Sequence, residues 1–214
     1  MIPQISDYKN YSLKILIITA IAFILQQIIP YFESIFILNS SYILSRPWMF
    51  LTSMFLHGSL MHIFFNMFAL MIFGPMIEQR IGSRRFLFVY IIGGIFANII
   101  GVFFYPQSLG ASGAIMAMLG TLVILMPHLR VFIYGLVPIP LWMAGIAWFL
   151  LDLFGSFSGT RGIGHIVHIV GLLFGLIFGL YLRNKTQKIS FKNIKPGKSM
   201  NKSNNVDEWI RRNS

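Results

Sequence analysis

A serine flanked by glycines stands inside an otherwise apolar stretch, in the segment Gly110-Ala111-Ser112-Gly113-Ala114. Small neighbours leave the hydroxyl unshielded, and the free N–H groups and positive dipole end of a helix N-terminus lie beside a serine in this position. Those features suit a nucleophile whose attack creates an oxyanion. The alternative is a packing seam, because Gly113, Ala117 and Gly120 recur at helical spacing.

Two histidines begin a second apolar stretch, in which His165 and His168 precede Gly171, Gly175 and Gly179. At about 100° per residue, the three glycines and His168 share one helix face. Such a face can press against another small-faced helix, and the stretch after Ser112 is the natural partner. His168 would then lie near Ser112 as a general base. The alternative is a histidine that only hydrogen-bonds across a helix interface.

A third polar group contains His57, His62 and Asn66. His62 and Asn66 are four residues apart, so they lie on the same helix face. Two side-chain donors directed at a developing negative charge would form an oxyanion hole. The alternative is hydrogen bonding that holds helices together. His57 precedes the helix, and we expect it to brace a loop.

The composition defines the kind of protein that must position these groups. The chain has 214 residues, of which 56% are apolar and only 11% charged, with a net charge of +11. Soluble domains carry about 25% charged residues, and disordered chains have low hydrophobicity. There is no cysteine, which excludes disulfides and thiolate metal sites. The composition therefore indicates a membrane protein with several spans.

Long intervals without charged residues predict an all-α, polytopic bundle of six transmembrane helices. The turn-like segment Tyr105–Gly110 divides one interval that is too long for a single span. We predict helices at about 15–31, 60–77, 86–104, 112–126, 138–154 and 163–182. The predicted division is a cytoplasmic segment at 1–14, a core at 15–183 and a basic, flexible cytoplasmic tail at 184–214.

The distribution of Lys and Arg predicts the orientation, because short loops rich in these residues stay in the cytoplasm. With both termini inside, only Arg46 and Arg161 lie on the outer side. The second, fourth and sixth helices then run in the same direction, and each carries its polar group early. This agreement favours catalysis over packing. The basic tail is expected to contact anionic lipid headgroups, and we predict no nucleic-acid partner.

The segments His62-Ile-Phe-Phe-Asn66, Gly110-Ala-Ser112-Gly113 and His168-Ile-Val-Gly171-Leu-Leu-Phe-Gly175 resemble, in this order, the motifs of rhomboid intramembrane serine proteases. The resemblance covers about residues 10–183. It implies a Ser–His dyad of Ser112 and His168, with an oxyanion hole formed by His62, Asn66 and the backbone N–H of Ser112. Gly110, Gly113, Gly171, Gly175, His57 and His165 would support this site. His165 precedes the position of the base in the motif and remains a competitor for that role.

The resemblance also implies an irregular segment at about 33–58 and a lateral gate for substrate at about 138–154. Many bacterial members carry Trp-Arg before the second helix, whereas this chain has Trp48-Met49. We expect this difference to alter loop stability rather than chemistry. The predicted function is that of a serine endopeptidase that cleaves transmembrane segments of membrane proteins, without metal or cofactor. The predicted location is a bacterial inner membrane, with the site open to the periplasmic or extracellular side.

Other classes of protein fit the sequence less well. A zinc protease would need His-Glu-x-x-His, and no Glu lies near His62 or His168. An aspartyl protease would need two intramembrane aspartates, and Asp152 is the only Asp in the predicted core. A channel or transporter would need a continuous polar path. A rhomboid-like binder without activity is the main alternative, although such proteins usually lack the serine or the histidine.

Overall fold

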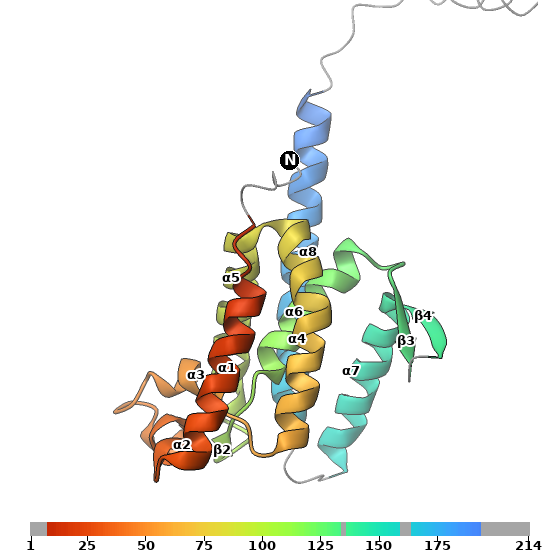
Figure 1. Cartoon of the computed structure of the whole chain (residues 1–214). Helices are drawn as coiled ribbons and strands as arrows, with labels where there is room; N and C mark the ends of the chain where they lie inside the picture. Colours follow the sequence, from red (N-terminus) through yellow and green to blue (C-terminus); the bar gives the residue numbers. More distant parts are fainter. Residues whose placement is uncertain (1–7, 134–135, 159–163, 194–214) are drawn as a thin grey trace, which may run out of the picture. The chain divides into compact units, whose positions relative to one another are not determined.

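A computed structural model describes residues 8–133, 136–158 and 164–193 (Figure 1). The chain divides into two compact units. Residues 2–183 form one unit, and residues 184–214 with Met1 form the other. The elements are α1 (Tyr11–Ile28), α2 (Phe32–Phe36), β1 (Leu38–Asn39), the 3-10 turn Ser40–Tyr42, α3 (Met49–Thr52), the 3-10 turn Ser53–Phe55, α4 (Leu60–Ile81), α5 (Ser83–Gly101), β2 (Gln107–Ser108), α6 (Ser112–Leu125), β3 (Arg130–Ile133), β4 (Val137–Pro140), α7 (Leu141–Phe157) and α8 (His165–Asn193).

The six long helices α1, α4, α5, α6, α7 and α8 correspond to the six predicted spans, and the predicted all-α bundle is confirmed. The largest shift at a helix start is in α1, which begins at Tyr11 rather than near 15. α7 begins at Leu141 rather than near 138. Pro138 and Pro140 lie in the β3–β4 hairpin, and a helix cannot continue through a proline that lacks an N–H. α8 runs beyond the predicted end at 182 to Asn193. Residues 1–7 and 194–214 of the two predicted terminal segments lie outside the described residues.

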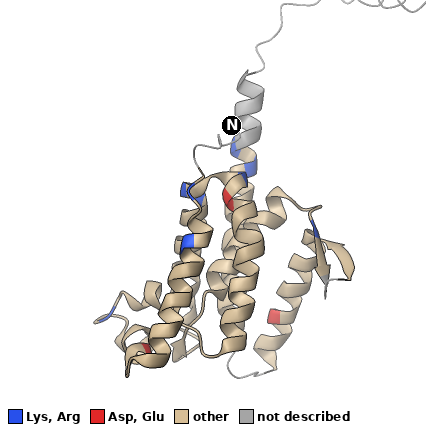
Figure 2. Cartoon of the chain, viewed as in Figure 1, with Lys and Arg blue, Asp and Glu red and all other residues tan. Residues whose placement is uncertain are grey.

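Apolar side chains cover the outer faces of the helices, as they must in lipid. α1, α4, α5 and α8 are long and apolar enough to cross a membrane, and α6 and α7 are shorter apolar helices. Large apolar residues such as Ile24, Leu60 and Leu151 are more than half exposed. Figure 2 shows that long stretches of the helices carry no charged residue. A surface of this kind is suited to acyl chains rather than to water.

Helix α6 lies against α4, α5 and α7, and glycines bring α8 against it. A Cβ added at Gly171 would collide with the carbonyl oxygen of Gly113, and one added at Gly175 with that of Ala117. Glycine is therefore required at these two crossings, where the two helices meet backbone to backbone. The predicted packing of the sixth helix against the fourth is thus observed, and it brings His168 close to Ser112.

The segment between α1 and α4 contains short helices and turns, in agreement with the predicted irregular segment. Its position is fixed by polar contacts, including Thr52 Oγ1 to Phe36 O at 2.9 Å and Asn98 Nδ2 to Phe50 O at 2.9 Å. Met49 is fully buried, whereas Trp48 is half exposed. A methionine suits this position because an arginine there would need a buried partner for its charge.

Candidate active site

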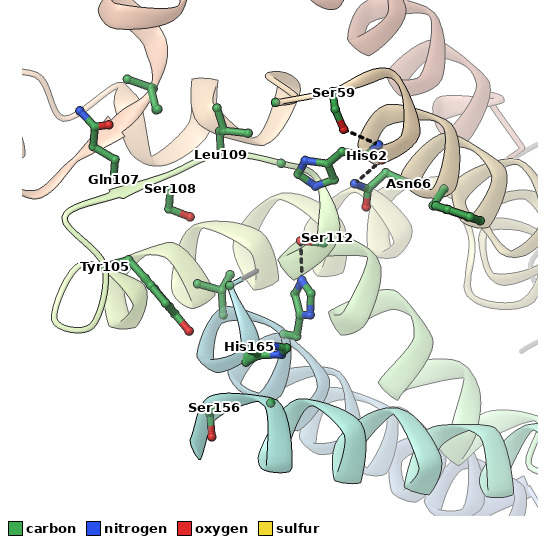
Figure 3. A pocket seen from close by; sticks show the side chains of 18 residues that line it. Ser59, His62, Asn66, Tyr105, Gln107, Ser108, Leu109, Ser112, Ser156 and His165 are labelled. Atoms are coloured by element: carbon green, nitrogen blue, oxygen red, sulfur yellow. Dashed lines mark hydrogen bonds between the residues drawn. The ribbon is translucent and has the colours of Figure 1, made fainter. Parts of the chain in front are cut away.

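A cavity of about 960 Å³ opens between α4, α6, α7 and α8, at the end of the bundle where α4, α6 and α8 begin (Figure 3). The residues that line it include His62, Asn66, Ser112, His165 and His168. Members of all three polar groups found in the sequence therefore meet at one cavity, which His57 does not line. The β1–β2 pairing joins Leu38 to Ser108, so the irregular segment also supports the chain leading to Ser112.

Ser112 is the first residue of α6, and a tight turn presents it to the cavity. Gly110 has a φ of 121°, a conformation that favours glycine, and its N–H donates to Ser53 O at 2.9 Å. A Cβ at Gly110 would also lie 2.8 Å from two ring atoms of His62. The requirement for glycine therefore has two causes here, a backbone conformation and a close approach.

His57 contacts this turn through a hydrogen bond. Its Nε2 accepts a long hydrogen bond, 3.5 Å, from the backbone N–H of Ala111, and its own backbone N–H donates to Gln26 Oε1 at 3.1 Å. The residue is fully buried, and this burial, with a smaller contribution from nearby His62, lowers the pKa of His57 to about 4. A neutral imidazole is needed at this position, because a protonated Nε2 could not accept from Ala111.

The Ser112 hydroxyl and the His168 ring are in direct contact, with Oγ and Nε2 2.8 Å apart. Figure 3 shows the dashed line between them across the cavity. The His168 side chain is 17% exposed, so it is shielded but reachable. Of the two histidines that compete for the role of base, His168 is the one whose ring nitrogen bonds to the serine. This geometry is the one required of a nucleophile and its general base.

The structure adds Asp152, a residue that the sequence motifs do not include. Its Oδ1 lies 3.0 Å from His168 Nδ1 and 2.8 Å from His165 Nδ1. Asp152 belongs to α7, whereas both histidines belong to α8. A single carboxylate inside an apolar span is costly, and this cost is the sequence signal that could have identified it.

His62 and Asn66 both line the cavity from α4, which begins where Ser59 Oγ accepts from the N–H of His62 at 3.1 Å. The side-chain amide of Asn66 donates to the backbone carbonyl of His62 at 3.0 Å. Figure 3 shows both side chains on the Ser112 side of the cavity. Their role as oxyanion donors stays a prediction.

The residues that the structure describes form no cluster of three or more His, Asp or Glu side chains arranged to hold a metal ion. The two histidines beside Asp152 share one carboxylate oxygen, so their Nδ1 atoms point at a common acceptor rather than at an open ligand position. This arrangement is suited to proton chemistry.

Comparison with curated proteins gives relatives from animals, plants and fungi. The chain is 31% identical over 164 residues to Presenilin-associated rhomboid-like protein A of Danio rerio, covering 68% of this chain and 43% of the relative. It is 26% identical over 169 residues to Rhomboid protein 1 of Saccharomyces cerevisiae, covering 74% and 48%. RHOMBOID-like protein 6 of Arabidopsis thaliana matches 80 residues at 35% identity, covering 36% and 26%. The chain spans less than half the length of each of these relatives.

These relatives correct the predicted location. All three are named as mitochondrial proteins. The prediction of a bacterial inner membrane with a periplasmic or extracellular site is therefore wrong. The prediction of a bacterial membrane rested on residue composition and short loops, and these features do not distinguish bacterial from mitochondrial membrane proteins.

The match to a family extends over most of the described bundle. The Rhomboid domain matches residues 44–185, which include α4, α5, α6, α7 and the part of α8 that lines the cavity. From this match we conclude that the chain belongs to the rhomboid family.

Proposed function

We propose that this protein is an intramembrane serine endopeptidase that cleaves transmembrane segments of other membrane proteins. The observation that supports the proposal is the 2.8 Å contact between Ser112 Oγ and His168 Nε2 in a cavity between apolar helices. A hydroxyl bonded to a neutral imidazole is activated for attack on a carbonyl carbon. The apolar outer faces support a membrane setting for this chemistry, in which the substrates would themselves be membrane helices.

The reaction proceeds in two halves. Ser112 Oγ attacks the carbonyl carbon of a peptide bond while His168 Nε2 takes the hydroxyl proton, which gives a tetrahedral intermediate. The C–N bond then breaks, and His168 returns the proton to the leaving amine. A water molecule, deprotonated by His168, hydrolyses the acyl-enzyme and restores the serine.

The negative oxygen of the tetrahedral intermediate needs donors, and three are available near Ser112. The backbone N–H of Ser112 is at the start of α6, where N–H groups have no partner within the helix. Side chains of His62 and Asn66 supply the other two donors from α4. Asn66 Nδ2 uses one of its two hydrogens to donate to His62 O, so the second remains for the substrate oxygen. Loss of one such donor costs ~3 kcal/mol of transition-state stabilisation.

Substitution of the nucleophile tests the proposal directly. The full chain in lipid bilayers is incubated with a labelled transmembrane peptide, and Ser112→Ala and His168→Asn are compared with the wild-type chain. We expect both variants to lose cleavage by at least about a thousandfold, because either loss removes the activated hydroxyl. A serine-directed fluorophosphonate should label the wild-type chain but not Ser112→Ala.

Thr121→Ser provides a matched hydroxyl control on the same helix, at a residue buried away from the cavity. It should retain wild-type cleavage and labelling. Cleavage that persists in Ser112→Ala would remove the proposed nucleophile. A wild-type chain that binds membrane peptides but neither cleaves them nor reacts with the fluorophosphonate would instead be a binder of membrane clients.

A further inference from the structure

Asp152 is one of the two buried carboxylates among the described residues, and it lies next to the proposed base. Its side chain is only 10% exposed, and its partners are imidazole rings of another helix. A carboxylate buried beside lipid has to gain enough from its partners to offset desolvation. The two histidines supply that compensation here, and one of them contacts the serine.

The Asp152 carboxylate determines which ring nitrogen of each imidazole carries a proton. An ionised carboxylate only accepts hydrogen bonds, so Nδ1 of both His165 and His168 must carry the proton. In a neutral His168 this leaves a lone pair on Nε2, which is the atom that faces Ser112 Oγ. Asp152 therefore selects the tautomer of His168 that can accept the serine proton. The opposite tautomer would direct an N–H at the hydroxyl and could not act as a base.

His165 fixes the carboxylate from the other side. Its ring packs against α7 where a Cβ at Gly155 would overlap it, and its Nε2 is buried without a hydrogen-bond partner among the described groups. The ring thus has one polar contact that is evident in the structure, with Asp152. Gly155 is three residues after Asp152, so both lie on the same face of α7. Asp152 is held in place by a ring that does not itself reach the serine.

We propose that Asp152 is a positioning residue for the reaction, which holds His168 in the tautomer and orientation that activate Ser112 and stabilises the imidazolium formed when the proton moves. It acts through His168 and does not touch the substrate. His165 is the anchor that keeps the carboxylate oriented. The site then works as a chain of contacts from His165 through Asp152 and His168 to Ser112. The inference rests on the proposed endopeptidase function.

The test compares the full-length Asp152→Asn, Asp152→Glu and His165→Phe variants in lipid bilayers with the wild-type chain. We expect Asp152→Asn to lower kcat and the rate of fluorophosphonate labelling by about a hundredfold, because the amide can no longer select the tautomer. KM should stay within about twofold. Asp152→Glu should recover part of the loss, since it restores a carboxylate, and His165→Phe should lose less activity than Asp152→Asn.

Glu78→Gln is the matched control, because it removes the other buried carboxylate at a distance from the cavity. It should lower thermal stability and leave kcat of the folded fraction unchanged. The proposal is overturned if Asp152→Asn keeps kcat within twofold of wild type. It is also overturned if Asp152→Asn lowers kcat only in proportion to the loss of folded protein, as a purely structural contact would.

A second measurement covers the case in which Asp152→Asn does not fold. The imidazole ¹⁵N spectrum of the wild-type chain, assigned with His168→Asn, should show Nδ1 of His168 protonated and Nε2 unprotonated at neutral pH. The reverse tautomer would contradict the proposal. Failure of the proposed function has a different signature: either the wild-type chain does not cleave, or Ser112→Ala and His168→Asn still cleave whatever Asp152 does.

Discussion

Glu78 and Asp152 are both buried carboxylates in apolar helices, but their partners differ in kind. Glu78 lies about four turns along α4 from His62, away from the cavity. It accepts from the backbone N–H groups of Tyr11 and Ser12 at 2.9 Å and from the hydroxyls of Ser12 and Ser83 at 2.9 and 2.5 Å. Asp152 accepts from two imidazole rings at the edge of the cavity.

The difference in partners separates a structural role from a chemical one. Backbone N–H groups and serine hydroxyls keep their protons at neutral pH, so the Glu78 cluster can only hold α1, α4 and α5 together. An imidazole can gain and lose a proton in that range, and one of those bound to Asp152 contacts a hydroxyl. Two carboxylates with similar burial therefore have different functions because their donors differ.

Replacement of Glu78 by glutamine should have a larger effect on stability than changes at Ser83, His57 or Thr121. One carboxylate oxygen becomes an NH₂ group that faces donors, so at least one of the four hydrogen bonds is lost and a buried donor is left unsatisfied. We expect a loss of about 3 kcal/mol in the free energy of unfolding. Thermal unfolding in detergent measures the loss, and cleavage per folded molecule should not change.

Ser83→Ala is a graded companion to this variant, since it removes only one of the four donors to Glu78. It should cost about 1 kcal/mol. A fall in cleavage per folded molecule in either variant would show that the two clusters are coupled, and the separation of a structural from a chemical carboxylate would then be lost.

Much of the site could be predicted from the sequence because its residues follow helical periodicity. The spacing of His168, Gly171 and Gly175 predicted a glycine face, and the face determined which helix α8 would approach. His168, whose Nε2 meets Ser112 Oγ, belongs to this pattern on α8, whereas Ser112 begins α6. The spacing of residues within α8 therefore predicted a contact between α8 and α6.

Asp152 was missed because no local pattern connects it to its partners. It lies on a different helix from His165 and His168, and only the packing of α7 against α8 brings them together. The β3–β4 hairpin was missed for a related reason, since its pairing of Arg130 with Pro140 depends on a turn rather than on periodicity. Contacts set by tertiary packing leave little trace in a single sequence.

His57 tests whether location or partner decides the role of a buried polar group. Its ring lies against that of His62, which lines the cavity, but it accepts from the backbone N–H of Ala111, so it resembles Glu78 in kind. Its pKa in the folded state is about 4, below the ordinary value of 6.5. Between these values the unfolded chain binds the extra proton, so stability is complete above about pH 6.5 and is lost as the pH falls toward 4.

We expect this titration to remove about 2 kcal/mol of unfolding free energy between pH 7 and pH 5. The measurement is the difference in thermal unfolding between the wild-type chain and His57→Gln, whose amide oxygen can accept from Ala111 but does not titrate. Subtraction of the variant removes the contribution of the other histidines. Equal pH dependence in both chains would mean that His57 is not held neutral by the fold.

Thr121→Val should have the smallest effect, because it alters the glycine-packed α6–α8 contact without touching either carboxylate cluster. The single proton of the Thr121 hydroxyl is shared between Ala117 O at 3.0 Å and Gly175 O at 3.1 Å, and valine keeps nearly the same volume. Both carbonyl oxygens retain other possible donors in their helices, so the expected loss is about 0.6 kcal/mol of unfolding free energy. Cleavage should stay within twofold of wild type. A tenfold loss of cleavage without a matching loss of stability would mean that the distance between α6 and α8 at Thr121 controls the contact between Ser112 and His168. The chemistry would then depend on helix packing as much as on the partners of Asp152.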